Sequence, residues 1–377
     1  MYINLKLFFR ALEIALFEKP ASPRRWFFVI AFTGLFLAFW CVVAAGRLLD
    51  HLLYPGYRDQ PVKEPVFIIA PPRSGTTITQ KLMALDEERF SCVRFYQCVF
   101  PAVTFHKIFD GIAWIDKQLG NPFAQLATWM EKVFFGGWED SHPMKFNEPE
   151  EDDGFFVYTF VTEAIYLLFP YVNELWGAGF MDDLSQPERR QVMRYYRSCL
   201  QRHLYATGPD KTQLSKATQL SGAFNCIRDE FPDAKIITII RHPRNSIPSH
   251  VSLFVPVWQT VDPTIKRDGP EAREYAEIAV AWFKHMYQAS QEQPKDRFYT
   301  IRFNELAKDN QGTIEKVYQH FGWPISDALR ARHEEASKKG KEFKSSHKYT
   351  LEEFGLSEEW VQTECKEVIE GYGLQEK

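Results

Sequence analysis

The sequence predicts an α/β fold in which helices cover both faces of a central, mostly parallel sheet. Three short runs rich in β-branched and aromatic residues, at 66–70, 235–240 and 298–303, are typical of buried strands. Segments with helical apolar spacing separate them, so consecutive strands need crossover connections. Ligands of such sheets bind beyond the carboxyl ends of the strands, where we expect the loops 71–77 and 241–249 to lie.

Helical spacing predicts the flanking helices, and composition predicts one large domain. Helices are expected at 122–135, 187–206, 271–293, 312–321 and 358–371. The apolar stretch 155–169 is interrupted by Glu163, and we interpret it as a buried helix and not as a membrane span. The chain has 377 residues, of which 45% are apolar, and no repeat or low-complexity linker divides it after residue 50. It can therefore bury a large core, as one big domain or two modest ones, and we place a single domain at 65–377.

The N-terminal part predicts attachment to a membrane. Residues 26–46 carry no charge and are long enough to cross a bilayer as a helix. Residues 4–18 are amphipathic and suit a membrane surface. Basic residues are more numerous in the segment 1–25 than in the expected stalk 47–64, which favours a cytoplasmic N-terminus and a large domain across the membrane. We therefore expect a single-pass protein, with a Golgi-type lumenal domain in a eukaryote or an inner-membrane location in a bacterium.

Charge and cysteine usage exclude several classes of partner. The formal net charge of −4 gives no general footprint for nucleic acid, so any anion site has to be local. The six cysteines form no CxxC pair and no Cys/His spacing suited to zinc. The sequence thus predicts neither a nucleic-acid partner nor a metal site.

The most informative segment is the loop Ala-Pro-Pro-Arg-Ser-Gly-Thr-Thr at 70–77, directly after the first predicted strand. Backbone N–H groups in such a strand–loop–helix unit, at the positive end of the helix, favour a phosphate. The side chains add a guanidinium and hydroxyls. The residues concerned are Arg73, Ser74, Gly75, Thr76 and Thr77. The loop lacks the Gly-Lys-Ser/Thr ending of a Walker A motif, so it predicts a phosphate site without a magnesium ion.

A second anion site is predicted where the strand 235–240 ends. Arg241 leaves a buried strand, where an arginine is costly unless it meets an anion. Pro243 disfavours helix just before it, and Asn245 is the expected cap of the helix that follows. Ser249 then lies one turn inside the helix and faces back toward Arg241. The alternative for Arg241 is a structural salt bridge.

These two segments resemble the sulfotransferases that use 3′-phosphoadenosine 5′-phosphosulfate (PAPS), especially the membrane-associated and bacterial branch. In that family the first loop holds the 5′-phosphosulfate, here Arg73 to Thr77. An arginine and a serine eight residues apart hold the 3′-phosphate, here Arg241 and Ser249. The resemblance extends to the segments 148–153, 214–216, 299–306 and 347–356.

The resemblance implies a P-loop NTPase-like three-layer fold and a membrane-anchored enzyme. The reaction it implies is transfer of a sulfuryl group from PAPS to a hydroxyl of a carbohydrate, a lipid or a small alcohol. One alternative is a catalytically impaired membrane protein that binds PAPS or its bisphosphate product. A P-loop nucleotide kinase is a weaker alternative, because the lysine and the magnesium-binding hydroxyl pattern are missing.

Sulfuryl transfer requires charge stabilisation at the leaving group and a base for the acceptor hydroxyl. Arg73 is expected to neutralise charge on the leaving bisphosphate. By resemblance to the cytosolic branch, Lys216 steadies the sulfuryl oxygens; its alternative is a surface lysine that closes a loop. We expect Glu150 or Glu151, next to an apolar run, to be the base, with a solvated helix start as the alternative.

Two positions that carry a base in relatives do not carry one here. The histidine of the cytosolic branch is replaced by Thr218, and Gln97 stands near the expected glutamate of other branches. His106 and His142 are further candidates, for which packing or surface roles are the simpler interpretation. The basic residues of 338–348 suit either a loop that closes over the cofactor or a solvated charge run.

Overall fold

A computed structural model describes residues 1–19, 22–122, 124–125, 128–129, 148–340 and 349–375. Its centre is a five-stranded sheet in the order β2-β3-β1-β4-β5, and all neighbouring strands are parallel. The strands are β1 (Val66–Ile68), β2 (Phe90–Cys92), β3 (Thr212–Lys216), β4 (Lys235–Ile240) and β5 (Phe298–Arg302). The three predicted strands are confirmed as β1, β4 and β5, whereas β2 and β3 were not predicted.

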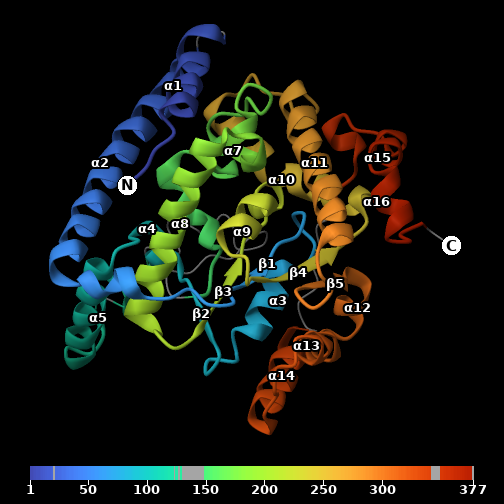
Figure 1. The fold of residues 1–377 in the computed structure, drawn as a ribbon. Coiled ribbons are helices and arrows are strands. Elements are labelled where there is room, and N and C mark those ends of the chain that lie inside the picture. Colours follow the sequence, from blue (N-terminus) through green and yellow to red (C-terminus); the bar gives the residue numbers. More distant parts are fainter. Residues whose placement is uncertain (20–21, 123, 126–127, 130–147, 341–348, 376–377) are drawn as a thin grey trace.

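The strand order places the first loop at the centre of the sheet (Figure 1). After β1 the chain builds β2 and β3 on one side of it, and then β4 and β5 on the other. The carboxyl end of β1 is therefore the point where the winding direction changes, which is where ligands of open α/β sheets bind. Ile68 of β1 pairs with Lys216 of β3 and Ile237 of β4, so the loops that follow these strands start close together.

Alternate residues of the strands face two separate cores. Phe67 and Ile69 belong to the larger core, and Val66 and Ile68 to the smaller one. The larger core is packed with α8 (Gln186–Thr207), α9 (Phe224–Glu230), α10 (Pro243–Val261) and α11 (Pro270–Glu292). The smaller core contains α3 (Thr76–Met83), α12 (Phe303–Lys308), α13 (Asn310–His320) and α14 (Asp327–Gly340). The predicted α/β class, a parallel sheet with helices on both faces, is confirmed.

Most of the predicted helices that fall on described residues are present. The helices 187–206, 271–293 and 312–321 correspond to α8, α11 and α13, and 358–371 is divided into α15 (Glu358–Glu364) and α16 (Lys366–Gly371). The helix predicted at 122–135 lies largely outside the described residues. The chain also forms α4 (Phe95–Val99), α5 (Val103–Gln118) and α7 (Trp176–Gly179), which were not predicted.

The expectation of one buried helix at 155–169 is wrong. The chain forms two 3-10 turns there, η3 (Asp152–Thr159) and η4 (Glu163–Leu167). Phe160 between them has φ of +59°, in the left-handed region, which breaks any continuous helix. The hydroxyl of Thr162 then caps the second turn by accepting from the backbone N–H of Ala164.

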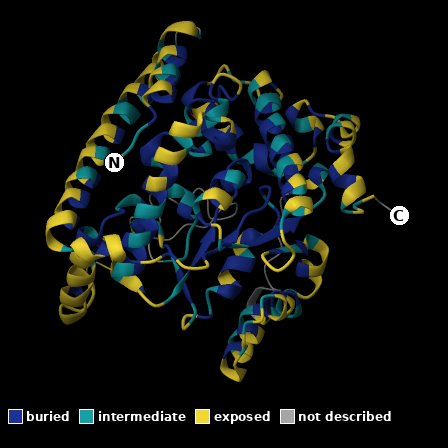
Figure 2. Ribbon diagram, viewed as in Figure 1, coloured by how far each residue is buried: buried dark blue, intermediate teal, exposed yellow. Residues whose placement is uncertain are grey.

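The N-terminal segment forms α1 (Leu5–Glu13), a π-helical turn (Ile14–Glu18) and the long helix α2 (Pro23–Leu53). Helix α2 includes the predicted span 26–46 and extends beyond it at both ends. A 3-10 turn at Pro55–Asp59 follows and contacts α8. With a mean hydropathy of 2.5 over its most apolar window, α2 is the one helix in the described part of the chain that is long and apolar enough to cross a membrane. Figure 2 shows that much of its outward surface is exposed.

Candidate active site

The first loop makes the tight turn that its glycine permits. Gly75 has φ of +95° and is the N-cap of α3; a Cβ atom there would lie 3.0 Å from Leu306. The buried hydroxyl of Ser74 donates to the carbonyl of Pro71 at 2.7 Å. Ser74 therefore holds the loop in shape, while the start of α3 supplies N–H groups at the carboxyl end of β1.

Arg73, Arg241 and Ser249 come together from three elements. Nε of Arg73 donates to Oγ of Ser249 at 3.1 Å, and Nη1 of Arg241 donates to the carbonyl oxygen of Arg73 at 2.8 Å. The guanidinium of Arg241 also lies 4.5 Å from the centre of the Phe303 ring. The structure thus joins the first loop, the end of β4 and the first turns of α10 into one cluster of donors.

The electrostatics of this cluster suit an anion. Burial lowers the pKa of Arg73 and that of Arg241, and the charge of Arg73 lowers the pKa of Arg241 further. Within the described residues no carboxylate forms an ion pair with Arg241, so the structural salt bridge considered from the sequence is not found there. Two neighbouring, partly buried guanidinium groups that repel each other fit a ligand with several negative charges, such as a phosphate ester.

The cap of α10 differs from the prediction. The N-cap is His242, whose Nδ1 accepts from the backbone N–H of Arg244 at 3.2 Å, and Pro243 is the first helical residue. Asn245 therefore lies inside the first turn, because proline is favoured at the start of a helix and moves the cap to the residue before it. The hydroxyl of Ser246 donates to the carbonyl of Pro72, which ties α10 to the first loop.

Lys216, the last residue of β3, is buried beside the loop. Its Nζ lies 2.8 Å from Oε1 of Glu151 and 3.3 Å from Oγ1 of Thr77, and the side chain is 1% exposed. Burial alone would lower the pKa of Lys216, but the charges of Glu151 and Glu150 outweigh it and raise the pKa. The interpretation of Lys216 as a surface lysine is therefore wrong.

Glu150 and Glu151 take different positions. Glu151 forms the ion pair with Lys216, whereas a carboxylate oxygen of Glu150 accepts from the backbone N–H of Glu151 at 3.0 Å. The backbone N–H of Glu150 donates to Val93, and its carbonyl accepts from Gln80. Both side chains are partly buried, and Glu151 is the N-cap of the 3-10 helix η3.

Gln97, near the glutamate site that the resemblance implies, and the further candidate His106 are both buried. Gln97 is buried and its Oε1 accepts from the backbone N–H of Arg94 at 2.8 Å, which caps α4. Burial lowers the pKa of His106, on α5, to about 4, so this histidine is neutral at physiological pH. His142 and residues 341–348 lie outside the described part of the chain.

Asp152 and Asp153, near Lys216, belong to the acidic cluster 148–153 that the sequence offers for the base, although only Glu150 and Glu151 were singled out from it. Asp152 accepts from Tyr196 at 2.6 Å and from Ser215 at 2.7 Å, and burial raises its pKa to about 6. Burial, together with the negative charges of Glu151 and Glu163, raises the pKa of Asp153 well above its ordinary value. Among the described residues no hydrogen bond is donated to the Asp153 side chain. The sequence showed the acidic run 148–153 but gave no sign of which member lacks a partner.

Glu163 is the centre of a second cluster of polar side chains, which was not predicted from the sequence. Its carboxylate accepts from Thr218 at 3.2 Å and from Tyr275 at 3.1 Å, and it lies 3.5 Å from Nε2 of His250. His250 is buried against the ring of Tyr275, and within the described structure neither of its ring nitrogens has a hydrogen-bond partner. The one sign of this cluster in the sequence was Glu163 itself, a charged residue inside the apolar run 155–169.

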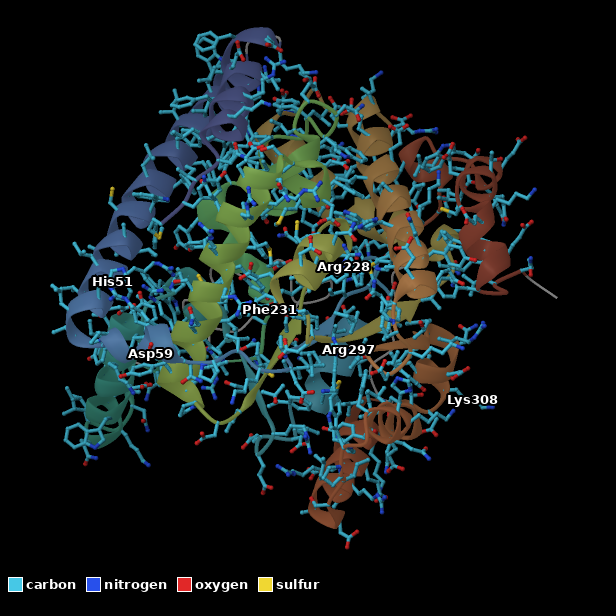
Figure 3. The ribbon with its side chains drawn as sticks, in the orientation of Figure 1. His51, Asp59, Arg228, Phe231, Arg297 and Lys308 are labelled. Carbon is cyan, nitrogen blue, oxygen red and sulfur yellow. The ribbon has the colours of Figure 1, made fainter. Side chains whose placement is uncertain are left out.

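A separate cavity lies at the opposite edge of the sheet and is not part of this site. It is lined by residues at the amino ends of β4 and β5, Ile236 and Phe298, and by Arg228, Phe231 and Arg297 (Figure 3). Arg241 and Lys216 stand at the carboxyl ends of their strands. Among the described residues, no group of three or more His, Cys, Asp or Glu side chains is arranged to hold a metal ion.

The fold and the cluster of donors suit the binding of an anion, and comparison with known proteins identifies the family. The profile of the sulfotransferase family matches residues 65–327, and the chain belongs to this family. It is accordingly a transferase. The resemblance inferred from the segments 70–77 and 241–249 is confirmed at the level of the family.

Individual relatives are distant. The omega-hydroxy-beta-dihydromenaquinone-9 sulfotransferases Stf3 of Mycobacterium bovis and Mycobacterium tuberculosis are each 23% identical over 362 residues, which covers 93% of this chain and 84% of theirs. The crystal structure of sulfotransferase STF9 from Mycobacterium avium superposes with a TM-score of 0.72 at 19% identity, over 98% of this chain and 97% of that one. The crystal structure of sulfotransferase STF1 from Mycobacterium tuberculosis superposes with a TM-score of 0.69 at 18% identity, over 96% of this chain and 91% of that one. These structures share the fold.

Proposed function

We propose that the domain 65–377 transfers a sulfuryl group from PAPS to the hydroxyl of an amphiphilic lipid. The observation that carries this proposal is the convergence of Arg73, Arg241 and Ser249 next to the buried Lys216. The family uses PAPS in general, and the P-loop-like arrangement of β1, loop and α3 supports the same co-substrate. PAPS supplies an activated sulfuryl group whose leaving group is a phosphate.

The two ends of PAPS are assigned to the two halves of the donor cluster. Arg241 and Ser249 hold the 3′-phosphate, because Arg241 has no carboxylate partner among the described residues and is repelled by Arg73. The loop from Arg73 to Thr77 holds the 5′-phosphosulfate with N–H groups at the start of α3. Arg73 lies between the two and balances charge on the departing bisphosphate.

Lys216 is assigned to the transferring group. Its ammonium lies against Thr77 and so borders the loop that receives the phosphosulfate. Glu151 keeps the lysine charged and fixes its direction through the ion pair. Glu151 is therefore a positioning residue in this proposal, and Glu150 stabilises the turn that presents it.

We assign the general base to Asp153. Glu151 forms an ion pair with Lys216, and Asp152 accepts hydrogen bonds from Tyr196 and Ser215. Asp153 stands next to both in the chain and has no hydrogen-bond donor among the described residues. Burial and the neighbouring acids raise its pKa, which makes its carboxylate a stronger base. Glu163 and Thr218 then orient the acceptor hydroxyl on the side where the cytosolic branch has its histidine.

Two observations favour a lipid acceptor over a carbohydrate or a small alcohol. The curated mycobacterial relatives are named for a reaction on omega-hydroxy-beta-dihydromenaquinone-9. In this chain, the exposed apolar surface of α2 gives the enzyme access to a membrane in which such an acceptor dissolves. We therefore place the enzyme at a membrane.

Calorimetric titration tests co-substrate binding. Adenosine 3′,5′-bisphosphate should bind the full-length protein in detergent more tightly than ATP with magnesium. The full chain is required, because a protein that begins at residue 51 would lack buried contacts of α2. Tighter binding of ATP, or bisphosphate binding that survives both Arg73→Ala and Arg241→Ala, would overturn the proposal. Lys308→Ala, on the exposed end of α12, is the matched control.

A further inference from the structure

Helix α2 is fastened to the catalytic domain at its N-terminal end. Nη1 of Arg25 lies 2.9 Å from Oδ2 of Asp262, just after α10, and both side chains are almost fully buried. Val29 and Phe36, one and three turns further on, are buried in the larger core. This end of the helix is thus part of the domain.

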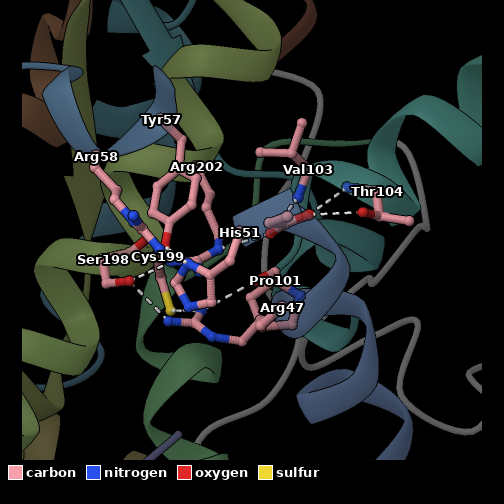
Figure 4. Close-up of polar contacts among 11 residues, drawn as sticks. Arg47, His51, Tyr57, Arg58, Pro101, Val103, Thr104, Ser198, Cys199 and Arg202 are labelled. Atoms are coloured by element: carbon pink, nitrogen blue, oxygen red, sulfur yellow. Dashed lines mark hydrogen bonds and ion pairs between the residues drawn. The ribbon is translucent and has the colours of Figure 1, made fainter. Parts of the chain in front are cut away.

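The C-terminal end of α2 is fastened as firmly (Figure 4). Asp50 is completely buried and accepts from Nε of Arg202 on α8 at 2.7 Å and from the backbone N–H of Thr104 at 2.8 Å. Arg47, also buried, donates to the carbonyl of Pro101 and to the hydroxyl of Ser198. Breaking such buried pairs costs about 3–5 kcal/mol each, so this end is also part of the domain.

These two attachments conflict with a helix that crosses a bilayer. A helix of 31 residues is about 45 Å long. Both of its ends, and buried residues between them, contact the same domain on one side. A spanning arrangement would place residues before α2 across the membrane and would pull Arg25 away from Asp262. The predicted single-pass arrangement therefore requires the loss of contacts that the structure contains.

The opposite face of α2 is apolar and exposed. Only 17% of its most apolar window is buried, although the helix is packed on the domain along its length. Exposed apolar side chains occur from the first turn to the last: Phe27, Ile30, Leu35, Leu37, Phe39, Val42, Leu48, Leu49, Leu52 and Leu53. An apolar face of this extent is rare on soluble monomers and marks a surface that another apolar phase covers.

Helix α5 continues this surface. α2 and α5 touch where Gly46 meets the Phe105 ring, so closely that a Cβ atom on Gly46 would lie 2.3 Å from it. The outer half of α5 exposes Ile108, Ile112, Ile115 and Leu119, spaced as one helical stripe, with Trp114 beside it. In Figure 2 both helices present exposed faces at the same margin of the molecule.

Basic residues accompany the apolar surface and define its partner. Lys6, Arg24, Lys107 and Lys117 are exposed on α1, α2 and α5. Tryptophans are exposed near the start of α2, at Trp26, and on α5, at Trp114. Lysine and tryptophan at the edge of an apolar helix face are typical of proteins that lie in the headgroup region of an anionic bilayer.

We propose that the outer faces of α2 and α5 form an in-plane membrane-binding surface, which enters one leaflet and leaves the whole chain on one side of the bilayer. The occupant is the lipid surface itself and not a second copy of the chain. This surface would bring the active site to an acceptor that stays in the membrane. The inference concerns attachment and stands independently of the sulfuryl transfer, because the topology experiment needs no activity.

A labelling experiment on sealed membranes separates the two arrangements. Single cysteines are introduced by Lys6→Cys and by Lys295→Cys, both at exposed positions, in a Cys41→Ser background. An impermeant maleimide should label both introduced cysteines in vesicles that carry the domain on their outer side. It should label neither cysteine in vesicles of the opposite orientation, which carry the domain inside. Reaction of one site only, with the other reacting after permeabilisation, would show a spanning helix and overturn the proposal.

Flotation of the full-length protein with vesicles tests the lipid partner. Binding to vesicles of phosphatidylglycerol and phosphatidylcholine should fall about five-fold for each of Lys107→Gln and Lys117→Gln at low salt, since a lysine near an anionic surface contributes about that factor. Ile112→Asp with Ile115→Asp should reduce binding to both mixed and neutral vesicles. Lys316→Gln on α13 is the matched control. Unchanged vesicle binding of the α5 variants would contradict the proposal. A dimer in which α2 packs on a second copy of the chain, and not on lipid, would also contradict it.

Discussion

The ammonium group of Lys216 lies 2.8 Å from Oε1 of Glu151, in a buried position at the carboxyl end of β3. A buried lysine without a partner would lose its proton readily, because burial disfavours the charged form. The glutamate offsets this effect and raises the pKa of Lys216 above its ordinary value. The pair therefore keeps a positive charge beside the first loop, where a sulfuryl group would be transferred.

Removal of Glu151 should change the pH dependence of the enzyme. In Glu151→Gln the pKa of Lys216 falls, because the charge that raised it is gone. In the proposed mechanism the charged form of Lys216 is the active one, so the alkaline limb of the kcat profile should move to lower pH. The profile of the wild type and of the variant, at saturating PAPS, measures the shift. A lower kcat with an unmoved alkaline limb would refute the role assigned to the pair.

Arg241 should discriminate between ligands with and without a 3′-phosphate. Loss of a charged hydrogen-bond donor costs about 1.5–3 kcal/mol, so Arg241→Ala should weaken binding of adenosine 3′,5′-bisphosphate by about 10- to 100-fold. Binding of adenosine 5′-monophosphate should be almost unchanged. Arg73→Ala should weaken both ligands. Equal losses for both ligands in Arg241→Ala would place the 3′-phosphate elsewhere.

Asp153→Asn should remove the base. Burial and the nearby acids raise the pKa of Asp153, so wild-type activity should fall as the pH decreases through that raised pKa and the carboxylate becomes protonated. The variant should lose kcat by about 10²–10⁴-fold and lose the acidic limb, while binding of the bisphosphate persists. Glu163→Gln is the informative comparison. If it abolishes the acidic limb and Asp153→Asn does not, Glu163 is the base.

The packing of α2 predicts a stability effect far from the site. Asp50→Ala leaves the buried Arg202 without its carboxylate, and the free energy of unfolding should fall by about 3–5 kcal/mol. The double variant Asp50→Leu with Arg202→Met removes both charges and should lose less. Thermal unfolding in detergent measures both. An unchanged Tm in Asp50→Ala would mean that this end of α2 is not held by the domain.

Local patterns in the sequence were sufficient for the sheet centre and for the first loop, but not for the whole sheet. β1 is entirely apolar and β4 has four isoleucines among its six residues, whereas β3 reads Thr-Gln-Leu-Ser-Lys and β2 has three residues. Two of the polar residues of β3 are paired with acids from the segment 151–152, Ser215 with Asp152 and Lys216 with Glu151. No periodicity within β3 reveals such partners, because they come from more than 60 residues earlier in the chain.

The acceptor side could not be predicted for the same reason. Glu163, Thr218, His250 and Tyr275 meet only through the packing of η4, η6 (Gln219–Gly222), α10 and α11. The apolar run 26–46 likewise predicts a membrane helix by length alone. Its position along the domain depends on Arg25, Arg47 and Asp50, which lie just outside that run and whose partners are distant in sequence.

Transfer of a radiolabelled sulfuryl group from PAPS to a membrane-lipid extract tests the central claim most directly. The full-length protein should label a lipid that carries a free hydroxyl, and Lys216→Met should reduce kcat by about 10²–10³-fold while it still binds the bisphosphate. Lys211→Met, just before the amino end of β3, should behave as wild type. Labelling of a carbohydrate or a small alcohol in preference to the lipid would replace the proposed acceptor. Full activity of Lys216→Met would contradict the account of the site.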